Sequence, residues 1–417
     1  MKMEHTTGKK RGGQSSKRLA AQSLERDQPD TLGATGAERN DTDDILIMEE
    51  EGMLNTHDPL PFGEGGWDVK KYCGCISMRM VNQSEDELDL EFDLVNVEAP
   101  IANALRRVLI AEVPSMAIEK VFLYQNTSCI QDEVFCHRLG LIPIHADARQ
   151  FAFPPPTNPS ATQKMNTDIL DEEPPGDAGH NLVFELNVTC PRGSKGRKKS
   201  AAKERNAQTI GSGSDSEETP GAAVDGCVRE GGGSGNWVVY TGAFEWRPIG
   251  DQRRHFAKEA PRLVHNDIIL AKLRPGQEIE ARCHCVKGIG RDHAKFSPVA
   301  TATYRLLPQI KLKRHDFDDE QATRLRSCFS TGVIGRDEQT GRVYVRDARA
   351  DTSSRNVFMH DDLKDAVEMG KKKTHFIFSV ESTGALPSHK LVVEACKVMR
   401  EKVDRLRDQI SARLEML

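Results

Sequence analysis

The chain has 417 residues, with 58 Lys and Arg against 63 Asp and Glu, so its formal net charge at pH 7 is −5. This length is typical of two or three domains, and the slight acidic excess argues against a general nucleic-acid binder. The sequence contains no run of 18 apolar residues, so no membrane span is predicted. Its ten cysteines are scattered over more than 300 residues, which indicates reduced thiols in a cytosolic or nuclear protein.

Two segments lack the composition of a folded domain. Residues 1–70 are predicted to be a disordered tail, because residues 41–58 contain seven acidic side chains and no Lys or Arg. Within this tail, the basic residues between Lys9 and Arg18 are consistent with a nuclear address or with plain solvated charge. Residues 191–235, basic at first and then rich in Ser, acids and Gly, are predicted to be a disordered loop inside a folded region.

The first folded elements are a strand and a helix. Between residues 88 and 94, four apolar residues alternate with three acidic ones, which predicts a strand with one buried and one solvated face. Pro100 then opens a helix, since its missing N–H costs nothing in a first turn, and Pro114 ends it. Four apolar residues share one stripe of this helix and two arginines lie beside it: Ile101, Leu105, Val108 and Leu109, with Arg106 and Arg107.

Further strands follow the same alternation. The apolar run 268–270, the turn-forming Arg274-Pro275-Gly276-Gln277 and the alternating run 279–285 together predict a β-hairpin, because Pro and Gly occupy the places that a type II turn requires. The other predicted strands cover residues 121–123, 182–188, 299–307 and 376–380.

A long amphipathic helix is predicted from about residue 388 to the C-terminus. Its apolar residues recur at intervals of three and four, which is nearly a heptad pattern. They are Leu391, Ala395, Met399, Val403, Leu406, Ile410, Leu414 and Leu417. Such a stripe covers the chain's own sheet or lies along a partner, and one helix can do both.

Sequence motifs for catalysis were not found. The chain has no GxxxxGK[ST] phosphate loop and no GxSxG elbow. Cys73 with Cys75 and Cys283 with Cys285 form CxC pairs, whereas a zinc site normally uses CxxC-like clips, and alternate strand positions suit one buried face. Two alternatives remain open: a metal-dependent enzyme that uses these cysteines, and a nucleic-acid-binding module that uses the basic loop 192–205.

Three stretches combine into a recognisable set. They read APIANALRRVLIAEVPSMAIE (99–119), QDEV (131–134) with HRLGLIP (137–143), and CVKGIG (285–290) with HAKFSP (293–298) and YRLLP (304–308). Together they resemble the alpha-like subunits of multisubunit RNA polymerases. Within that family, the chain is most similar to the larger alpha-like subunit shared by eukaryotic RNA polymerases I and III, and the segment FIFSVESTGALP (376–387) also fits that subunit.

The resemblance implies an α+β fold in two parts. One part is a discontinuous dimerisation domain of sheet and amphipathic helices, here residues 71–116 and 297–417, and the other is an inserted, mainly β domain, here residues 117–296. Some relatives hold zinc or an iron–sulfur cluster through cysteines of the inserted domain. Residues 144–189 and 236–282 contain no cysteine, so we predict no metal or other cofactor, and this absence favours the polymerase I and III subunit over the polymerase II one.

The resemblance also implies a function. In this family the largest subunit supplies the catalytic aspartates, so the chain is expected to be a non-catalytic scaffold of RNA polymerases I and III. It would form an obligate heterodimer with a smaller alpha-like subunit and dock the second-largest subunit, with the other polymerase subunits assembling around them. Such a complex transcribes ribosomal and small non-coding RNA genes in the nucleus, including the nucleolus. The chain itself would touch nucleic acid only through the complex and would touch no membrane.

Candidate interface residues follow from the two amphipathic helices. Some of the apolar ones must fill the chain's own core, and the sequence does not assign them singly. Candidates for contact with the smaller subunit are Ile101, Leu105, Val108, Leu109, Leu406, Ile410 and Leu414. The resemblance implies that the large subunit is docked through Arg106, Arg107, His137 and Arg138, and guanidinium forks suit carboxylate partners there.

Overall fold

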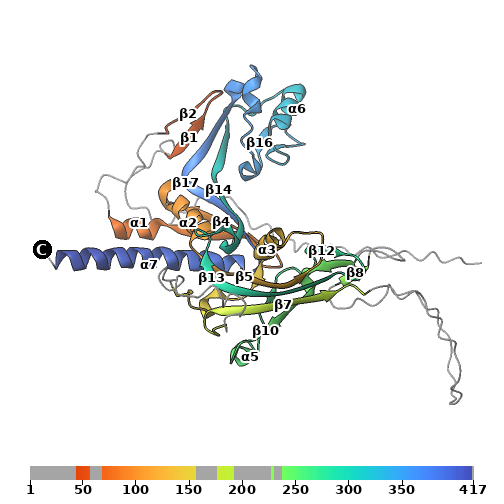
Figure 1. The fold of residues 1–417 in the computed structure, drawn as a ribbon. Helices are drawn as coiled ribbons and strands as arrows, with labels where there is room; N and C mark the ends of the chain where they lie inside the picture. The colour runs from red at the N-terminus through yellow and green to blue at the C-terminus, as the bar shows by residue number, and fades with distance from the viewer. Residues whose placement is uncertain (1–43, 57–67, 156–175, 192–226, 230–236, 416–417) are drawn as a thin grey trace, which may run out of the picture.

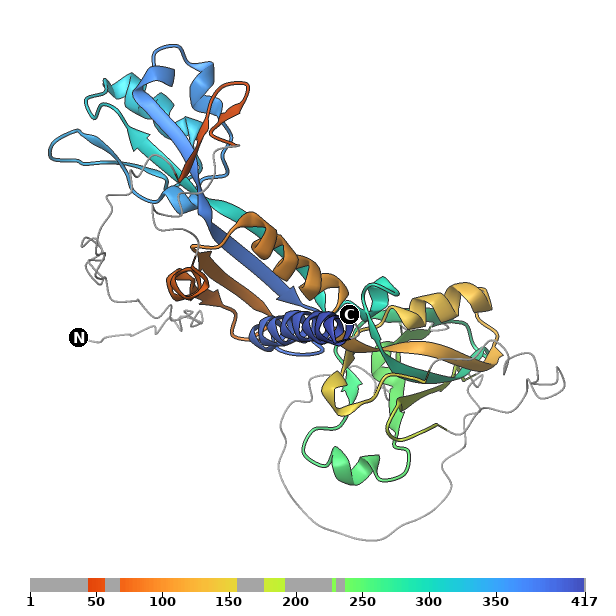
Figure 2. The ribbon, with the colours of Figure 1, turned by 90° about the vertical axis from the view of Figure 1, so that its left-hand side faces the viewer.

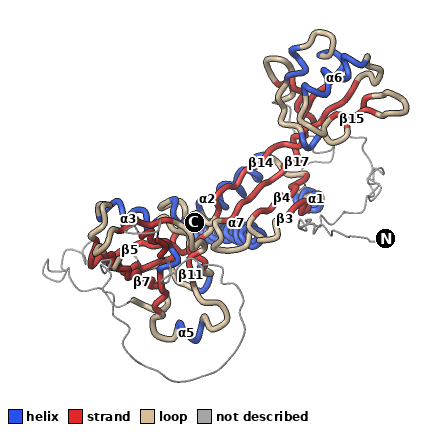
Figure 3. Tube along the Cα trace, turned by 90° about the vertical axis from the view of Figure 1, so that its right-hand side faces the viewer, coloured by secondary structure: helices blue, strands red, loops and turns tan. Residues whose placement is uncertain are grey.

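The computed structural model describes residues 44–56, 68–155, 176–191, 227–229 and 237–415. The protein is α+β, as the sequence predicted. Most buried apolar side chains of these residues fall into three cores, here called the central, inserted and third cores. They follow one another along an elongated molecule, with the central core between the other two (Figures 1, 2 and 3).

The central core lies between one face of an antiparallel sheet and two helices. The sheet pairs its strands in the order β3 (Ser77–Gln83), β4 (Asp89–Val95), β17 (Val367–Ser382) and β14 (Val299–Leu312). Leu90, Phe92 and Leu94 of β4 are buried, which confirms the predicted alternation. The helices on this face are α2 (Ala99–Ala111) and α7 (Ser388–Leu414), and the short helix α1 (Val69–Cys75) precedes β3.

Helix α2 begins as the sequence predicted. Pro100 stands in its first turn, where no backbone donor is needed. The helix ends at Ala111, before the predicted stop at Pro114, and the N–H of Glu112 closes the last turn on the carbonyl of Val108. Pro114 instead begins the next strand, β5 (Pro114–Asn126), which leads into the inserted core.

The inserted core is built mainly from strands. One sheet has the order β10 (Phe244–Arg247), β7 (Asn181–Thr189), β13 (Glu278–Ile289) and β5. A smaller sheet has the order β12 (Ile269–Leu273), β9 (Trp237–Tyr240) and β8 (Cys227–Arg229). A third sheet pairs β11 (Arg262–Leu263) with β6 (Ile144–His145). The helices here are α3 (Asp132–Gly140), α5 (Gln252–His255), η1 (Ala148–Gln150) and η2 (Thr241–Ala243). Helix η3 (Ala294–Phe296) connects β13 to β14.

The hairpin predicted for residues 268–285 is wrong. The turn itself forms, since the N–H of Gln277 donates to the carbonyl of Arg274 at 3.0 Å and Gly276 has φ +88°. However, β12 pairs with β9, whereas β13 lies between β7 and β5 in another sheet. The alternation identified two strands correctly, but the turn passes the chain from one sheet to the next.

The third core lies at the far end of β14 and β17. It contains α6 (Asp319–Cys328), β15 (Ile334–Arg336), β16 (Val343–Val345) and the turns η4 (Ala348–Ala350), η5 (Asn356–Met359) and η6 (Lys364–Ala366). Leu325, Val333 and Leu363 are fully buried in it. The sequence did not anticipate this core, and the predicted domain boundaries stay a prediction.

Part of the predicted disordered tail is folded. Strands β1 (Ile45–Met48) and β2 (Met53–Leu54) form a hairpin, and β1 pairs with β17. Ile45 and Met48 are buried, and Lys371 and Lys372 of β17 stand opposite β1 in the pairing. Pairing with β17 supplies backbone hydrogen bonds that the segment could not make when considered alone.

A second segment that we predicted to be disordered also contains structure. Strand β8 falls within residues 191–235 and pairs with β9, because its backbone completes the edge of the small sheet. The basic run 192–205 and the possible nuclear address near the N-terminus lie outside the described residues.

The central and inserted cores are joined by close contacts. His145 Nδ1 lies 2.8 Å from the carbonyl oxygen of Gly384, and its Nε2 lies 2.7 Å from Glu259. Gly384 has φ +93°, and a Cβ there would lie 2.4 Å from Val264. A Cβ on Gly290 would lie 2.2 Å from the carbonyl oxygen of Ile110. Both glycines are therefore required where the two cores meet.

Candidate functional site

Helix α7 divides into a packed half and an exposed half. Leu391, Val392 and Ala395 are buried in the central core. Farther along, Leu406, Ile410 and Leu414 are 58%, 52% and 66% exposed, and Val403 is exposed as well. The C-terminal end of the helix projects from the rest of the molecule (Figure 1). We call Val403, Leu406, Ile410 and Leu414 the distal ridge.

Two methionines extend the exposed apolar surface on the same side of the sheet. Met78 and Met80 of the edge strand β3 stand opposite Leu94 and Phe92 of β4. Because cross-strand partners share a face, the methionines lie on the side that the helices cover, and both are exposed. Sequence reasoning missed them, although their spacing of two residues was a usable signal.

Three candidates for partner contact lie instead in the chain's own core. Leu105, Val108 and Leu109 are at most 5% exposed and pack in the central core against the sheet. The period of a helix shows which face is apolar but not what covers it. Of the stripe predicted on α2, Ile101 is 39% exposed, so its contact with a partner stays a prediction, as do those of Leu406, Ile410 and Leu414.

The two arginines of α2 have different surroundings. Arg106 is partly buried, and its Nε and one terminal nitrogen donate to the side-chain oxygen of Asn103, at 3.1 and 2.9 Å. Arg107 is exposed on the helix. Of the pair, Arg107 is therefore the better placed to reach another protein.

The two docking candidates of α3 also differ. The guanidinium of Arg138 donates to the carbonyls of Leu270 and Ile269, at 2.9 and 2.8 Å, so it ties α3 to β12. His137 is exposed on the same helix. The structure does not bring α2 and α3 into one core, since α2 belongs to the central core and α3 packs on the inserted one.

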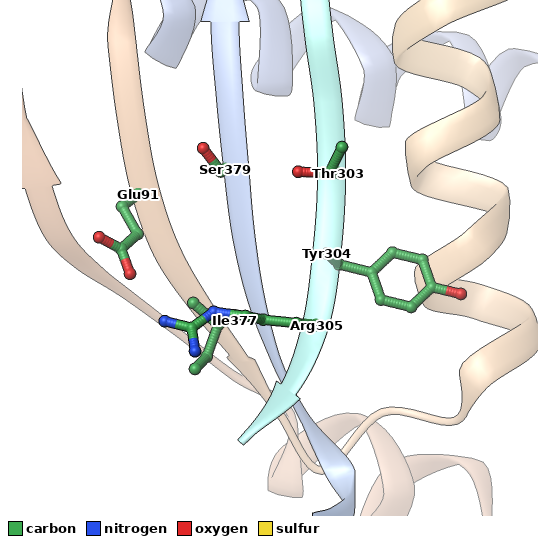
Figure 4. Close-up of a pocket in the computed structure, with 6 residues that line it drawn as sticks. All are labelled: Glu91, Thr303, Tyr304, Arg305, Ile377 and Ser379. Atoms are coloured by element: carbon green, nitrogen blue, oxygen red, sulfur yellow. The ribbon is translucent and has the colours of Figure 1, made fainter. Parts of the chain in front are cut away.

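The sheet face opposite the helices carries paired charges. Arg349 of η4 donates to Asp93 at 2.7 Å and to Glu91 at 2.6 Å. Figure 4 shows Glu91 and Arg305 on this polar face, around an open pocket of about 280 Å³, whereas Tyr304 points toward α2. Because Arg349 satisfies both carboxylates, we interpret this cluster as the attachment of η4 to the sheet.

The buried cysteines have the environment of core residues. Cys283 and Cys285 are fully buried, as their alternate spacing predicted. Burial disfavours the thiolate and raises the pKa of both thiols above the ordinary value. Cys73 and Cys75 are exposed on α1.

This difference predicts selective labelling by a thiol reagent such as iodoacetamide. In the native protein, Cys73, Cys75 and Cys129 should react, because they are exposed. Cys190, Cys283 and Cys285 should react only after denaturation. Peptide mapping by mass spectrometry checks this, and native labelling of Cys283 would contradict the described packing.

Within the described ranges, no group of three or more His, Cys, Asp or Glu is arranged to hold a metal ion. Among the same residues, no helix has the length and apolar character needed to span a membrane. What the described surface does offer is apolar and charged contact area for other proteins.

Comparison with known proteins agrees with this description. The RNA polymerase Rpb3/Rpb11 dimerisation domain matches residues 91–403. The chain is 42% identical over 374 residues to the mouse (Mus musculus) DNA-directed RNA polymerases I and III subunit RPAC1, covering 88% of this chain and 95% of the relative. It is 37% identical over 345 residues to the Saccharomyces cerevisiae protein of the same name, covering 83% and 90%.

A more distant relative belongs to other polymerases. The DNA-directed RNA polymerases II, IV and V subunit 3 of Arabidopsis thaliana is 30% identical over 329 residues, covering 76% of this chain and 86% of the relative. The chain therefore belongs to the Rpb3/Rpb11 family of alpha-like RNA polymerase subunits. The resemblance found in the sequence is confirmed, including its similarity to the subunit of RNA polymerases I and III.

Proposed function

We propose that this chain is the non-catalytic assembly subunit shared by RNA polymerases I and III. It forms an obligate heterodimer with a smaller alpha-like subunit, docks the second-largest subunit, and acts in the nucleus, including the nucleolus. The names of the relatives support the two polymerases. The distal ridge is the observation that carries the assembly role, because a folded chain rarely leaves such a row of apolar side chains in water.

The heterodimer uses the helix-bearing side of the central sheet. The distal ridge, Ile101, and the edge residues Met78 and Met80 supply exposed apolar surface there. Removing this surface from water on association provides the main driving force, at roughly 25 cal/mol per Å². The packed half of α7 holds the exposed half in place, so the chain does not have to order this helix on binding.

The large subunit is docked through exposed polar groups of α2 and α3. Arg107 and His137 contribute to this surface directly, while Arg106 and Arg138 are held by contacts within the chain. A guanidinium can bind a carboxylate through two parallel hydrogen bonds. No catalytic group is assigned to the chain. Affinity purification from cells, followed by identification of the co-purifying subunits, tests this proposal as a whole.

Arg107→Glu is expected to leave the heterodimer intact and to weaken capture of the second-largest subunit tenfold or more. The reversed charge would face the carboxylates that the arginine is proposed to bind. Pull-down with the purified heterodimer measures capture, and size-exclusion chromatography measures heterodimer yield. Arg253→Glu, at an exposed position of α5, is the matched charge reversal and should capture normally. Unchanged capture by Arg107→Glu would remove this arginine from the interface.

A further inference from the structure

A groove lies where the central and inserted cores meet. Its volume is about 480 Å³, enough for a few side chains of another polypeptide. Met116, Ile144 and Val299 line it, and so does Leu141, which is 51% exposed. Leu141 is the C-cap of α3, one turn after exposed His137, so the groove continues the proposed docking surface.

The rim of the groove carries two acidic groups that form no ion pair among the residues that the structure describes. Asp89 of β4 and Glu381 of β17 stand directly opposite each other in the strand pairing, and both are exposed. Like charges in such a pair are destabilising. The lysine that lines the groove, Lys295, is already engaged, because its ammonium lies 2.5 Å from Glu119 and donates to the carbonyl of Ile118.

Other acidic side chains of β4 have a positively charged partner. Farther along β4, Glu91 and Asp93 are neutralised by Arg349, at 2.6 and 2.7 Å. At Asp89 and Glu381, the contact found is a hydrogen bond from Thr301 to Glu381 at 3.3 Å, which supplies no positive charge. The rim of the groove thus has the charge that a cationic side chain of a partner would complement.

The face on which the acidic pair lies indicates which subunit can reach it. Leu90 and Val380, the neighbours of Asp89 and Glu381 along their strands, are buried under the helices. Successive residues of a strand point to opposite faces, so the acidic pair faces away from the distal ridge. A small subunit that covers the helix side therefore leaves the groove free for a different subunit.

We propose that the groove receives an extended segment of the second-largest polymerase subunit. This segment places an apolar side chain against the exposed Leu141, and an adjacent Lys or Arg between Asp89 and Glu381. The inference rests on the proposed function, and it identifies a second contact besides Arg107, with the opposite charge. Docking through two patches of opposite sign fixes the orientation of the large subunit.

The test uses the co-expressed heterodimer and the second-largest subunit of the same organism's RNA polymerase I. Glu381→Lys should weaken capture tenfold or more, and the loss should shrink at high salt, where the charged contact is screened. Glu338→Lys, an exposed charge reversal on the loop between β15 and β16, should capture normally. Leu141→Ser, which removes apolar contact without adding charge, should also weaken capture, and heterodimer yield should be unchanged in all three variants.

The outcomes separate the groove from the proposed function. Normal capture by both Glu381→Lys and Leu141→Ser, while Arg107→Glu captures poorly, would overturn the groove and leave large-subunit docking standing. Normal capture by all of these variants would remove both. A loss of the smaller subunit from Glu381→Lys, with capture otherwise unaffected, would show that the groove belongs to the heterodimer interface and would also overturn the inference.

Discussion

Ile410→Asp is expected to abolish capture of the smaller alpha-like subunit. Ile410 lies in the middle of the distal ridge and is 52% exposed, so the substitution should leave the fold of the chain intact. In the heterodimer, the new carboxylate would be buried without a partner, which costs about 3 kcal/mol or more. That cost corresponds to at least a roughly hundredfold loss of affinity. Co-purification of the two co-expressed subunits measures it.

A control on the same turn of helix makes the result specific. Ala412 lies two residues after Ile410, about 200° around the helix from it and away from the ridge, and it is exposed. Ala412→Asp introduces the same charge away from the ridge and loses more helix propensity than Ile410→Asp does, so a normal heterodimer yield would exclude a helix effect, and a normal yield is expected. If Ile410→Asp also gave a normal yield, the ridge would not be the heterodimer interface.

Phe378→Ala is expected to destabilise the central core by about 3–5 kcal/mol. The ring of Phe378 is fully buried and stacks on Phe92, with centroids 5.0 Å apart. It also contacts Tyr304, at a centroid distance of 5.3 Å. Removing it leaves a cavity between β17, β4 and β14 that the surrounding strands cannot close. Thermal unfolding of the purified heterodimer measures the loss.

The matched control lies on the other face of the same sheet. Thr303 is exposed on β14, next to the polar pocket, and Thr303→Ala should change the free energy of unfolding by about 0.5 kcal/mol or less. An equally small effect of Phe378→Ala would mean that the central core does not depend on this aromatic cluster.

Much of the local structure could be predicted because buried apolar residues recur in the sequence with the period of a strand or a helix. The alternation around Leu90 and the stripe around Leu391 both mark buried faces in the structure. The same periodicity does not identify the strand, helix or partner protein that covers the apolar face. It therefore predicted two strands correctly but paired them wrongly as a hairpin, and it could not tell that Leu105, a candidate for partner contact, is buried by the chain itself.

Long-range pairing explains the other misses. The acidic composition around Ile45 argued for disorder, whereas the strand there pairs with β17, more than 300 residues away. Likewise, nothing near Arg349 in the sequence indicates that it holds Glu91 and Asp93, which are about 250 residues earlier. The groove beside Asp89 and Glu381 could not be predicted either, because it exists only where two cores meet.

The pairing of β4 with β17 also has a consequence for synthesis on the ribosome. The residues of the inserted core, 116–285, are contiguous and can collapse while translation continues, whereas β4 must wait about 290 residues for its neighbour. The distal ridge follows β17 in the chain and therefore emerges after it. A chain terminated before residue 403 lacks the surface proposed for the smaller subunit, so we expect such a product not to form the proposed heterodimer.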